Sequence, residues 1–503
     1  MLKLATLFGA LFIATSAIAA PLTAPLTDAQ RALHALNRLG YGPAPGDVQR
    51  VQAMGVERYI DQQLHPEKMA LPPVLAQKLT ALQRAAPAPG EMLSEFRPPR
   101  GSDTLTAEQK QQARREVYQR AAQQVNEMRL LSAVYSPRQL EEVMTDFWFN
   151  HFNVYADKGI TRVFVADYER SAIRPYALGR FRDLLGATAK HPAMLFYLDN
   201  WQSTATGYRV NGKGKVLGLN ENYARELMEL HTLGVDGGYT QQDVTELARM
   251  LTGWTFDPRG DAAGAVAFRY DAARHDNGSK TWLKQAVAPA GQAEGERALD
   301  VLAASPVTAR HISYQLAQYF VADVPPPALV NQLTQRYLAT QGDIRAVLAT
   351  LFASPAFWDS ANVGSKFKTP YQYVVSATRA SGAQLNNVRP LVNMLRQLGM
   401  PLYGCQTPDG YKNTEAAWLN ANAIATRISF ATALGSGRMP LARAPELDAS
   451  APMSDAEISP VDPAALAATL GPTLSANART TISAADAALQ PSLMLGSPDF
   501  QRH

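Results

Sequence analysis

Acidic, amide and basic side chains gather in the stretch GLNENYARELMELHTLGVDGGYTQQDVTELARMLTGW, which runs from Gly218 to Trp254. We expect a helix from 221 to 232, and steps of about 100° per residue sort its side chains into an apolar and a polar arc. The catalytic candidates on the polar arc are Glu221, Arg225, Glu226 and Glu229. Two interpretations fit this arc: a solvated face tied by pairs worth about 0.2–0.5 kcal/mol each, or the wall of a pocket.

A second polar stripe runs through EEVMTDFWFNHFNV, where Glu142, Asp146, Asn150 and Asn153 fall at i, i+4, i+8 and i+11. Aromatic residues surround the stripe, and partial desolvation raises the pKa of a carboxyl group toward general-acid use. An amide or arginine partner would cancel that shift. Asp146 and Asn150 are therefore catalytic candidates, whereas His151 fits either core packing or a binding role.

Two further segments carry polar candidates. In RHDNGSKTWL, His275, Asp276 and Lys280 are binding candidates, although adjacent His and Asp side chains normally diverge and surface charges on a turn are the simpler expectation. In HPAMLFYLDN, Asp199 is a catalytic candidate at either a helix end or the lip of a pocket.

The metal candidates are weak. His231 falls on the apolar arc, where we expect a buried, hydrogen-bonded side chain. Asp236 and Asp243 fit two positions of a calcium-binding loop of the EF-hand type, but Thr232 and Gly234 stand where carboxylates are expected. The sequence requires no cofactor, and a divalent metal held by His231 or His275 is a minor alternative. HExxH, GxSxG, P-loop, GxGxxG and CxxC motifs are absent from the sequence.

The elements that must position these residues are helices. Apolar periodicity predicts an all-α fold, a large multi-helical domain of packed amphipathic helices with minor β content. A long helix is expected after Thr106, and two short helices are expected between Thr27 and His65. The best strand candidates are NVYADK (153–158) and AVAFRYD (265–271). We expect the helical domain to span 20–435, with a loop or boundary near 85–106 and a partly flexible Ala-, Pro- and Ser-rich segment at 436–503.

The first 19 residues have the features of a secretory signal peptide: one lysine, an apolar run and small residues before the expected cleavage after Ala19. No later run reaches the roughly 18 apolar residues that a membrane span needs. The formal net charge of +4 is small for 503 residues and gives no indication of nucleic-acid binding. Cys405 is the only cysteine, which excludes internal disulfides and thiolate metal clusters. An exported, periplasmic or secreted protein is predicted.

Several of these stretches together resemble a known family, the bacterial exported proteins of domain-of-unknown-function family 1800. They include LNRLGYGP, FWFNHFNV, the long Gly218 to Trp254 stretch, HDNGSKTWL, PLYGCQTPDGY and GSPDFQR. The resemblance covers most of the mature chain. It departs at Lys284, where the family usually has glycine, and at the insertion TGYRVNGKGKV. The site geometry is least predictable near these two places.

The resemblance implies kinship more than chemistry, since the activity of the family is unassigned. It favours the pocket interpretation and adds Asn220, Asn222 and Trp254 as binding candidates, because they match the family motif. Family members are often encoded beside an exported sulfatase-like protein of unknown-function family 1501. Two functions stay open: a hydrolase of an envelope or extracellular polymer with a carboxylate and amide pocket, or a non-catalytic binding or assembly protein working with that partner.

Overall fold

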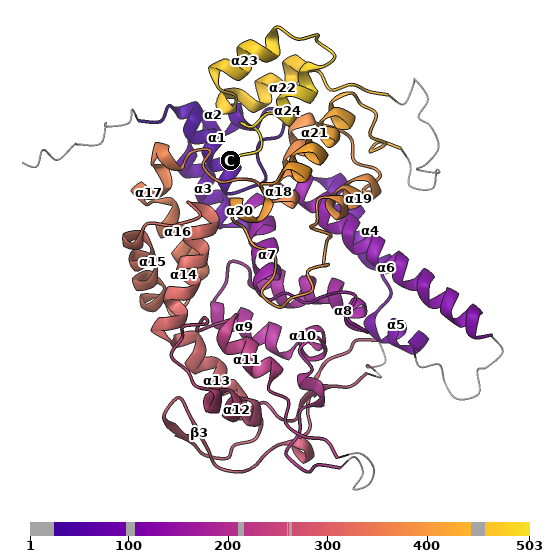
Figure 1. Cartoon of the computed structure of the whole chain (residues 1–503), viewed down its shortest axis with the longest axis vertical. Coiled ribbons are helices and arrows are strands. Elements are labelled where there is room, and N and C mark those ends of the chain that lie inside the picture. Colours follow the sequence, from indigo (N-terminus) through magenta and orange to yellow (C-terminus); the bar gives the residue numbers. More distant parts are fainter. Residues whose placement is uncertain (1–24, 97–105, 210–215, 259, 261–263, 444–457) are drawn as a thin grey trace, which may run out of the picture.

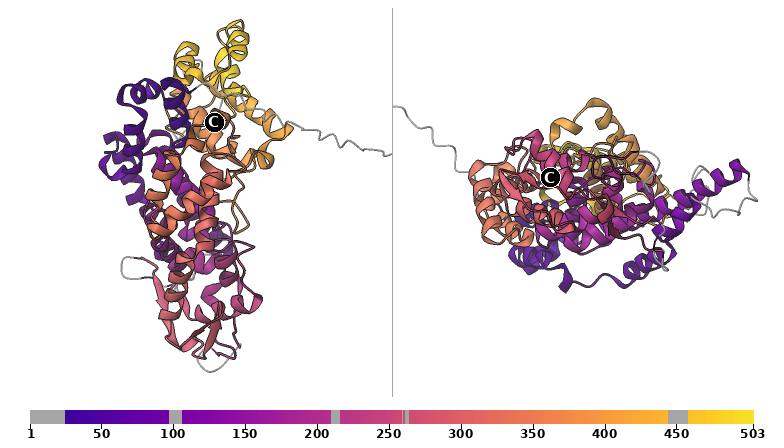
Figure 2. Two further views of the ribbon diagram at one scale, coloured as in Figure 1. Left: turned by 90° about the vertical axis from the view of Figure 1, so that its left-hand side faces the viewer. Right: turned by 90° about the horizontal axis from the view of Figure 1, so that it is seen from below.

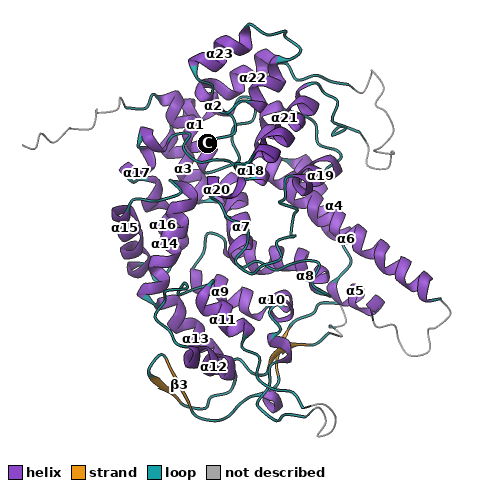
Figure 3. Cartoon of the chain, viewed as in Figure 1, coloured by secondary structure: helices purple, strands orange, loops and turns teal. Residues whose placement is uncertain are grey.

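The computed structural model describes residues 25–96, 106–209, 216–258, 260, 264–443 and 458–503. The predicted signal peptide lies outside these ranges. Helices make up 61% of the structure, and strands are limited to two small antiparallel pairs (Figure 3). The prediction of a largely helical fold with minor β content is confirmed.

Helix α7 (Gln139–His151) lies near the centre of the molecule (Figure 1). It packs against α3 and α6, and most of its side chains are buried. The N-terminal helices are α1 (Asp28–Arg38), α2 (Asp47–Met54) and α3 (Val56–Leu64). Two helices were expected here, but Gly55 adopts a φ of 88° and divides the second into two. This conformation is open to glycine at little cost.

The next three helices are α4 (Pro73–Ala85), α5 (Pro89–Phe96) and α6 (Ala107–Tyr135). The long helix predicted after Thr106 is confirmed, and Thr106 caps it by accepting the backbone N–H of Gln109. α6 extends away from the rest of the molecule (Figure 2). The loop expected at 85–106 contains α5, whereas residues 97–105 lie outside the described ranges.

The part of the molecule below α7 in Figure 1 is built from short helices and both strand pairs. These helices are α8 (Thr161–Asp167), α9 (Phe181–Lys190), α10 (Pro192–Tyr197), α11 (Asn222–Glu229), α12 (Gln241–Met250) and α13 (Gln292–Ala304). The strands are β1 (Trp254–Phe256) paired with β2 (Phe268–Tyr270), and β3 (Lys280–Trp282) paired with β4 (Gln285–Val287).

One of the two strand predictions is right. AVAFRYD contains β2, but NVYADK is a loop. Its backbone and side chains bond to a distant loop instead of a sheet: the N–H of Ala156 donates to the carbonyl of Tyr403 at 3.0 Å, and Asn153 also bonds to that loop.

The remaining helices form the left edge and the top of Figure 1. They are α14 (Pro306–Phe320), α15 (Pro327–Ala339), α16 (Ile344–Phe352), α17 (Pro355–Trp358), α18 (Pro370–Ser381), α19 (Arg389–Gln397), α20 (Glu415–Trp418), α21 (Ala421–Gly435), α22 (Pro463–Leu470), α23 (Ala476–Ser483) and α24 (Gln490–Gly496). The Ala- and Pro-rich segment therefore ends in three helices, and α24 packs on α21. Residues 444–457 lie outside the described ranges.

Candidate active site

A cavity of about 250 Å³ lies between α7, the end of α11, α14 and the loop that joins α19 to α20. Its polar lining is Asp146, Asn150, His151, Glu229, His311, Gln315, Gln318, Thr369, Asp409, Tyr411, Lys412 and Asn413. Apolar atoms come from Phe147, Leu230, Val235, Tyr319 and Met400, among others. The cavity brings together four residues selected from the sequence, namely Asp146, Asn150, His151 and Glu229.

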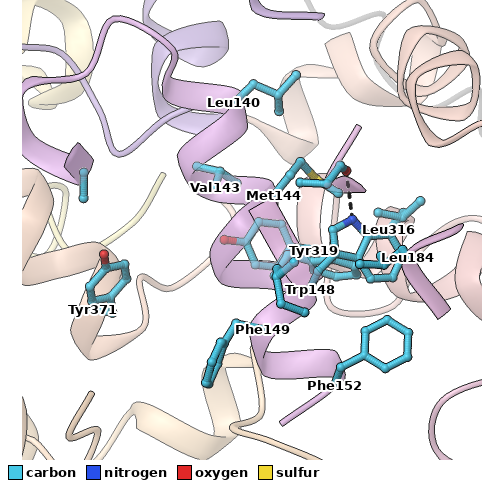
Figure 4. Close-up of a cluster of buried hydrophobic side chains, with 14 of the residues drawn as sticks. Leu140, Val143, Met144, Trp148, Phe149, Phe152, Leu184, Leu316, Tyr319 and Tyr371 are labelled. Carbon is cyan, nitrogen blue, oxygen red and sulfur yellow. Dashed lines mark hydrogen bonds between the residues drawn. The ribbon is translucent and has the colours of Figure 1, made fainter. Parts of the chain in front are cut away.

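Packing of the apolar side of α7 determines the rotation of the helix about its axis. Figure 4 shows Leu140, Met144 and Trp148 packed among side chains of neighbouring helices. Trp148 is fully buried, and its indole N–H donates to the carbonyl oxygen of Ala177 at 3.0 Å. With this side anchored, Asp146 and Asn150 line the cavity.

Asp146 lines the cavity, and its carboxylate pairs with Arg129. Burial raises the pKa of Asp146, and Arg129 offsets part of this rise. The other side of Arg129 contacts Glu169 at 2.9 Å, in a π-helical turn at Tyr168–Ile173. Asp146 therefore takes up a proton more readily than an exposed aspartate does.

Arg129 is itself held in place by aromatic rings. Its guanidinium lies 4.9–5.4 Å from the ring centroids of Phe149, Tyr371 and Tyr403, a distance typical of cation–π contacts. The hydroxyl of Tyr403 donates to Glu169 at 2.9 Å. This packing fixes the partner of Asp146.

The rest of the predicted stripe on α7 has structural partners. Glu142 accepts two hydrogen bonds from Arg174, at 2.9 and 2.8 Å. Asn150 donates to the carbonyl oxygen of Tyr411 at 2.8 Å and accepts the N–H of Tyr411 at 2.7 Å. Asn153 donates to the same loop. We therefore assign Asn150 the role of positioning the loop, since its amide is already engaged.

The loop between α19 and α20 descends to α7 and forms one wall of the cavity (Figure 1). Gly410 in this loop has a φ of 67°, and a Cβ there would lie 2.2 Å from the carbonyl oxygen of Asn150. Only glycine permits this approach. The loop is thus pinned against α7 at the point where Asp409 and Tyr411 line the cavity.

Asp409 has the opposite electrostatic setting to Asp146. Burial disfavours its charged form, but hydrogen bonds from Lys412 and Thr407 outweigh this and hold the pKa of Asp409 below its usual value. The Lys412 Nζ lies 2.6 Å from the carboxylate. One cavity therefore contains a carboxyl group whose pKa is raised and another whose pKa is lowered.

Two glutamates of α11 add negative charge on one side of the cavity. Glu229 lines it, and its carboxylate accepts a hydrogen bond from the Tyr239 hydroxyl at 3.4 Å. Glu226 is half-buried, and burial followed by the charges of Glu229 and Asp409 raises its pKa. Neither glutamate forms an ion pair with a described Lys or Arg.

Two buried histidines, His151 and His231, and the partly buried His311 lie beside or on the cavity. His151 donates from Nε2 to the carbonyl oxygen of His231 at 3.1 Å. Burial lowers the pKa of His151 and of His311, and it lowers the pKa of His231 to about 3. All three imidazoles are therefore neutral at physiological pH.

Three buried polar atoms of lining residues have no hydrogen-bond partner among the described residues. They are Nε2 of His311, Oε1 of Gln315 and Oδ1 of Asn413. Buried polar groups in proteins are nearly always paired, and such exceptions call for a ligand or solvent. The cavity is thus equipped to bind a polar molecule.

The other half of the polar arc on α11 is structural. Glu221 accepts hydrogen bonds from Thr245 at 2.7 Å, from Gln241 at 2.8 Å and from Arg225 at 3.3 Å. These contacts tie α11 to α12 and leave Glu221 and Arg225 outside the cavity. The arc is therefore divided: its start holds two helices together, and its end lines the cavity.

The candidates that precede α11 also have local partners. Asn220 accepts the N–H of Asn222 at 3.0 Å, which caps the start of α11. Asn222 donates to the carbonyl of Leu198 at 3.4 Å. Asp199, whose φ is 62°, pairs with Lys158 at 2.8 Å. None of these side chains lines the cavity.

His275, Lys280 and Asp276 form a separate cluster near β3 and α13. Surface charges on a turn were the simpler expectation here. For His275 and Lys280 this expectation is wrong, because both side chains are buried and contact the buried carboxylate of Glu294. Its carboxylate lies 2.7 Å from Lys280 Nζ and 3.1 Å from His275 Nε2. Asp276 binds Arg249 through two contacts, at 2.8 and 3.1 Å.

Trp254 is fully buried, with its indole ring against α13. A Cβ at Gly295 would lie only 2.3 Å from that ring, so the glycine makes room for it. Trp254 is therefore a core residue and is not accessible to a ligand.

The metal candidates are not brought together. Asp236 is exposed, His231 is buried, and Asp243 caps α12 by accepting the N–H of Thr240 at 2.8 Å. Asp243 also accepts the N–H of Leu283 at 2.7 Å. In the part of the chain that the structure describes, no group of three or more His, Cys, Asp or Glu side chains is arranged to hold a metal ion.

Sequence reasoning did not select four of the residues that define the cavity, namely Asp409, Lys412, His311 and Gln315. A signal existed for the first two. PLYGCQTPDGY is one of the stretches that carry the family resemblance, and its Asp-Gly pair is typical of a tight turn. His311 and Gln315 lie four residues apart on α14, so they share a helix face, but this spacing has no distinctive chemistry.

Fold and site together define a mostly helical protein with a cavity lined by carboxylates, amides and neutral histidines. Among the described residues, no helix is both long and apolar enough to cross a membrane. The family model described as "Protein of unknown function (DUF1800)" matches residues 34–502, and the chain belongs to this family. No curated protein and no solved structure matches the chain.

Proposed function

We propose that this protein is a hydrolase that cleaves a polyhydroxylated polymer, such as a glycan, in the cavity beside α7. One observation carries the proposal: Asp146 and Asp409 line the same cavity, and their pKa values are shifted in opposite directions. Pairs of carboxyl groups with pKa values pushed apart are the usual basis for acid and base roles.

Each carboxyl group then has a defined part in the reaction. Protonated Asp146 donates its proton to the oxygen of the leaving group as the C–O bond breaks. Ionised Asp409 accepts a proton from the attacking water, whose oxygen forms the new bond to carbon. One water is consumed, and each carboxyl group is restored by proton exchange with solvent.

The other lining groups support binding of a hydroxyl-rich molecule. Amides of Gln315, Gln318 and Asn413 offer donors and acceptors, and Tyr319 and Tyr411 offer aromatic surface. Pockets of this mixed kind fix the orientation of a ligand through a few polar groups. With the signal-like N-terminus, this supports a polymer of the cell envelope or the extracellular medium as substrate.

Release of reducing ends from a panel of polysaccharides tests the proposal. We expect Asp146→Asn to lower the rate by about 10²–10⁴-fold, the usual range for loss of a general acid, and Asp409→Asn to act similarly. Asp199→Asn, which removes an ion-paired carboxylate outside the cavity, should leave the rate unchanged. Wild-type protein inactive on every polymer, or full activity in Asp146→Asn, would overturn the proposal.

A second candidate function is binding without catalysis, in an assembly with a sulfatase-like protein of unknown-function family 1501. The ion pair between Asp146 and Arg129 favours it, because a carboxylate held by an arginine is also a common structural element. Polymer binding without hydrolysis, together with co-purification of the two proteins, would support this alternative.

A further inference from the structure

The charges around the cavity are unevenly compensated. Asp146 has Arg129 and Asp409 has Lys412 as a cationic partner. Glu229 has none, and the charge of Glu229 raises the pKa of its neighbour Glu226. The end of α11 therefore leaves net negative charge on one side of the cavity.

The described lining of the cavity has no unpaired cationic side chain that would bind an anion. Among the described lining residues, Lys412 is the only Lys or Arg, and Asp409 engages it at 2.6 Å. The histidines are neutral because burial lowers their pKa values. A carboxylate, sulfate or phosphate on the ligand would meet Glu229 without a free cation to offset the repulsion.

Unpaired acceptors accompany this negative charge. Oε1 of Gln315 and Oδ1 of Asn413 are buried and lack a donor among the described residues. An ammonium group has three N–H donors and no acceptor. The carboxylate of Glu229 and these two amide oxygens are acceptors in the lining of one cavity, to which an ammonium group can donate.

We infer that the ligand of this cavity carries a protonated amine, and that within the proposed hydrolase function the substrate is a polymer of amino sugars with free amino groups. The inference rests on the proposed function for the polymer, but the amine preference follows from the lining of the cavity. Glu229 is the specificity-determining residue, and it is separate from the acid and base.

Calorimetric titration of the full mature protein at pH 6 tests the inference, with three trisaccharides as probes: β-1,4-linked glucosamine, its fully N-acetylated form and galacturonic acid. We expect the glucosamine trimer to bind at least about tenfold more tightly than the acetylated one, since charge-assisted hydrogen bonds are the stronger kind. The galacturonate trimer should bind most weakly. The preference should shrink at high salt.

Glu229→Gln should remove the preference for the glucosamine trimer while leaving binding of the acetylated trimer within about twofold. Glu221→Gln is the matched control, because Glu221 lies at the start of the same helix, outside the cavity, and this variant should keep the preference. Thermal melting of each variant checks that it is folded, and Glu229→Asp serves as a second variant if Glu229→Gln fails to fold.

The inference fails if no trimer binds, if the amino and acetylated trimers bind equally, or if Glu229→Gln keeps the preference. The variant Asp146→Asn separates failure of this inference from failure of the proposed function. It should lose hydrolysis and keep the amine preference. An amine preference without hydrolysis in the wild type would overturn the hydrolase proposal and leave the ligand assignment standing.

Discussion

Two regions of this molecule bury charged side chains, and they do so differently. In the cluster near β3, the side chains of His275, Lys280 and Glu294 have no exposed surface. Glu294 contacts both partners and also accepts the N–H of Ala290 at 2.8 Å. In the cavity, the carboxylate of Glu229 forms no ion pair with a described Lys or Arg and contacts the hydroxyl of Tyr239, and two amide oxygens of the same lining are unpaired among the described residues.

This difference separates charges that are fully paired from charges that have room for a further partner. A buried charge is tolerated when a partner and hydrogen bonds replace the lost water, and such a closed group has no capacity left for a ligand. The cavity has retained that capacity. Both sequence segments contain charged residues. The two regions differ only in whether each charged side chain has a complete set of partners.

Breaking the closed cluster should give the largest effect. Lys280→Met leaves the charge of Glu294 buried without its main partner, and we expect a loss of about 3–5 kcal/mol in the free energy of unfolding. Urea denaturation measures it. The double variant Lys280→Met, Glu294→Gln should recover more than half of the loss, since it removes the unpaired charge.

In contrast, Glu229→Gln in the cavity should change the free energy of unfolding by less than about 1 kcal/mol, because no ion pair is lost. A loss in Glu229→Gln as large as that in Lys280→Met would contradict the distinction between the two regions.

The dependence of the free energy of unfolding on pH gives a further test on the cavity side of the comparison. Burial lowers the pKa of His231 to about 3, against about 6.5 in the unfolded chain. The unfolded state therefore takes up the proton first, so stability is complete above about pH 6.5 and falls as the pH drops toward 3. His231→Phe should reduce this slope by about 1.4 kcal/mol per pH unit between pH 6 and 4.

Urea denaturation at pH 7, 6, 5 and 4 measures the slope. An unchanged slope in His231→Phe would show that the proton enters this histidine without unfolding the surrounding core.

Helices were largely predictable, because they depend on local sequence. The long helix expected after Thr106 is α6, and the helix expected at 221–232 contains α11. NVYADK failed as a strand because its partners lie about 250 residues away in the chain. Local periodicity contains no information on such contacts.

The site was predictable only in part, for the same reason. Asp146 and Glu229 were selected from their helical spacing, but their different roles depend on Arg129 and on the loop containing Asp409. Asn150 was expected to be catalytic, and its amide instead holds Tyr411. Pairing between distant segments decides which polar residues are structural, and a single sequence does not display it.

The smallest expected effect concerns the turn between β3 and β4, next to the closed cluster. Leu283 and Lys284 have φ values of 47° and 63°, as in two-residue hairpin turns that favour glycine. Lys284 therefore carries a conformational cost at this position of the turn. Lys284→Gly should raise the free energy of unfolding by about 0.5–1 kcal/mol. Lys284→Ala is the control, because it removes the same charge but keeps the Cβ. Stabilisation by Lys284→Gly alone assigns the effect to the backbone conformation. Equal stabilisation by both variants would assign it to the charge.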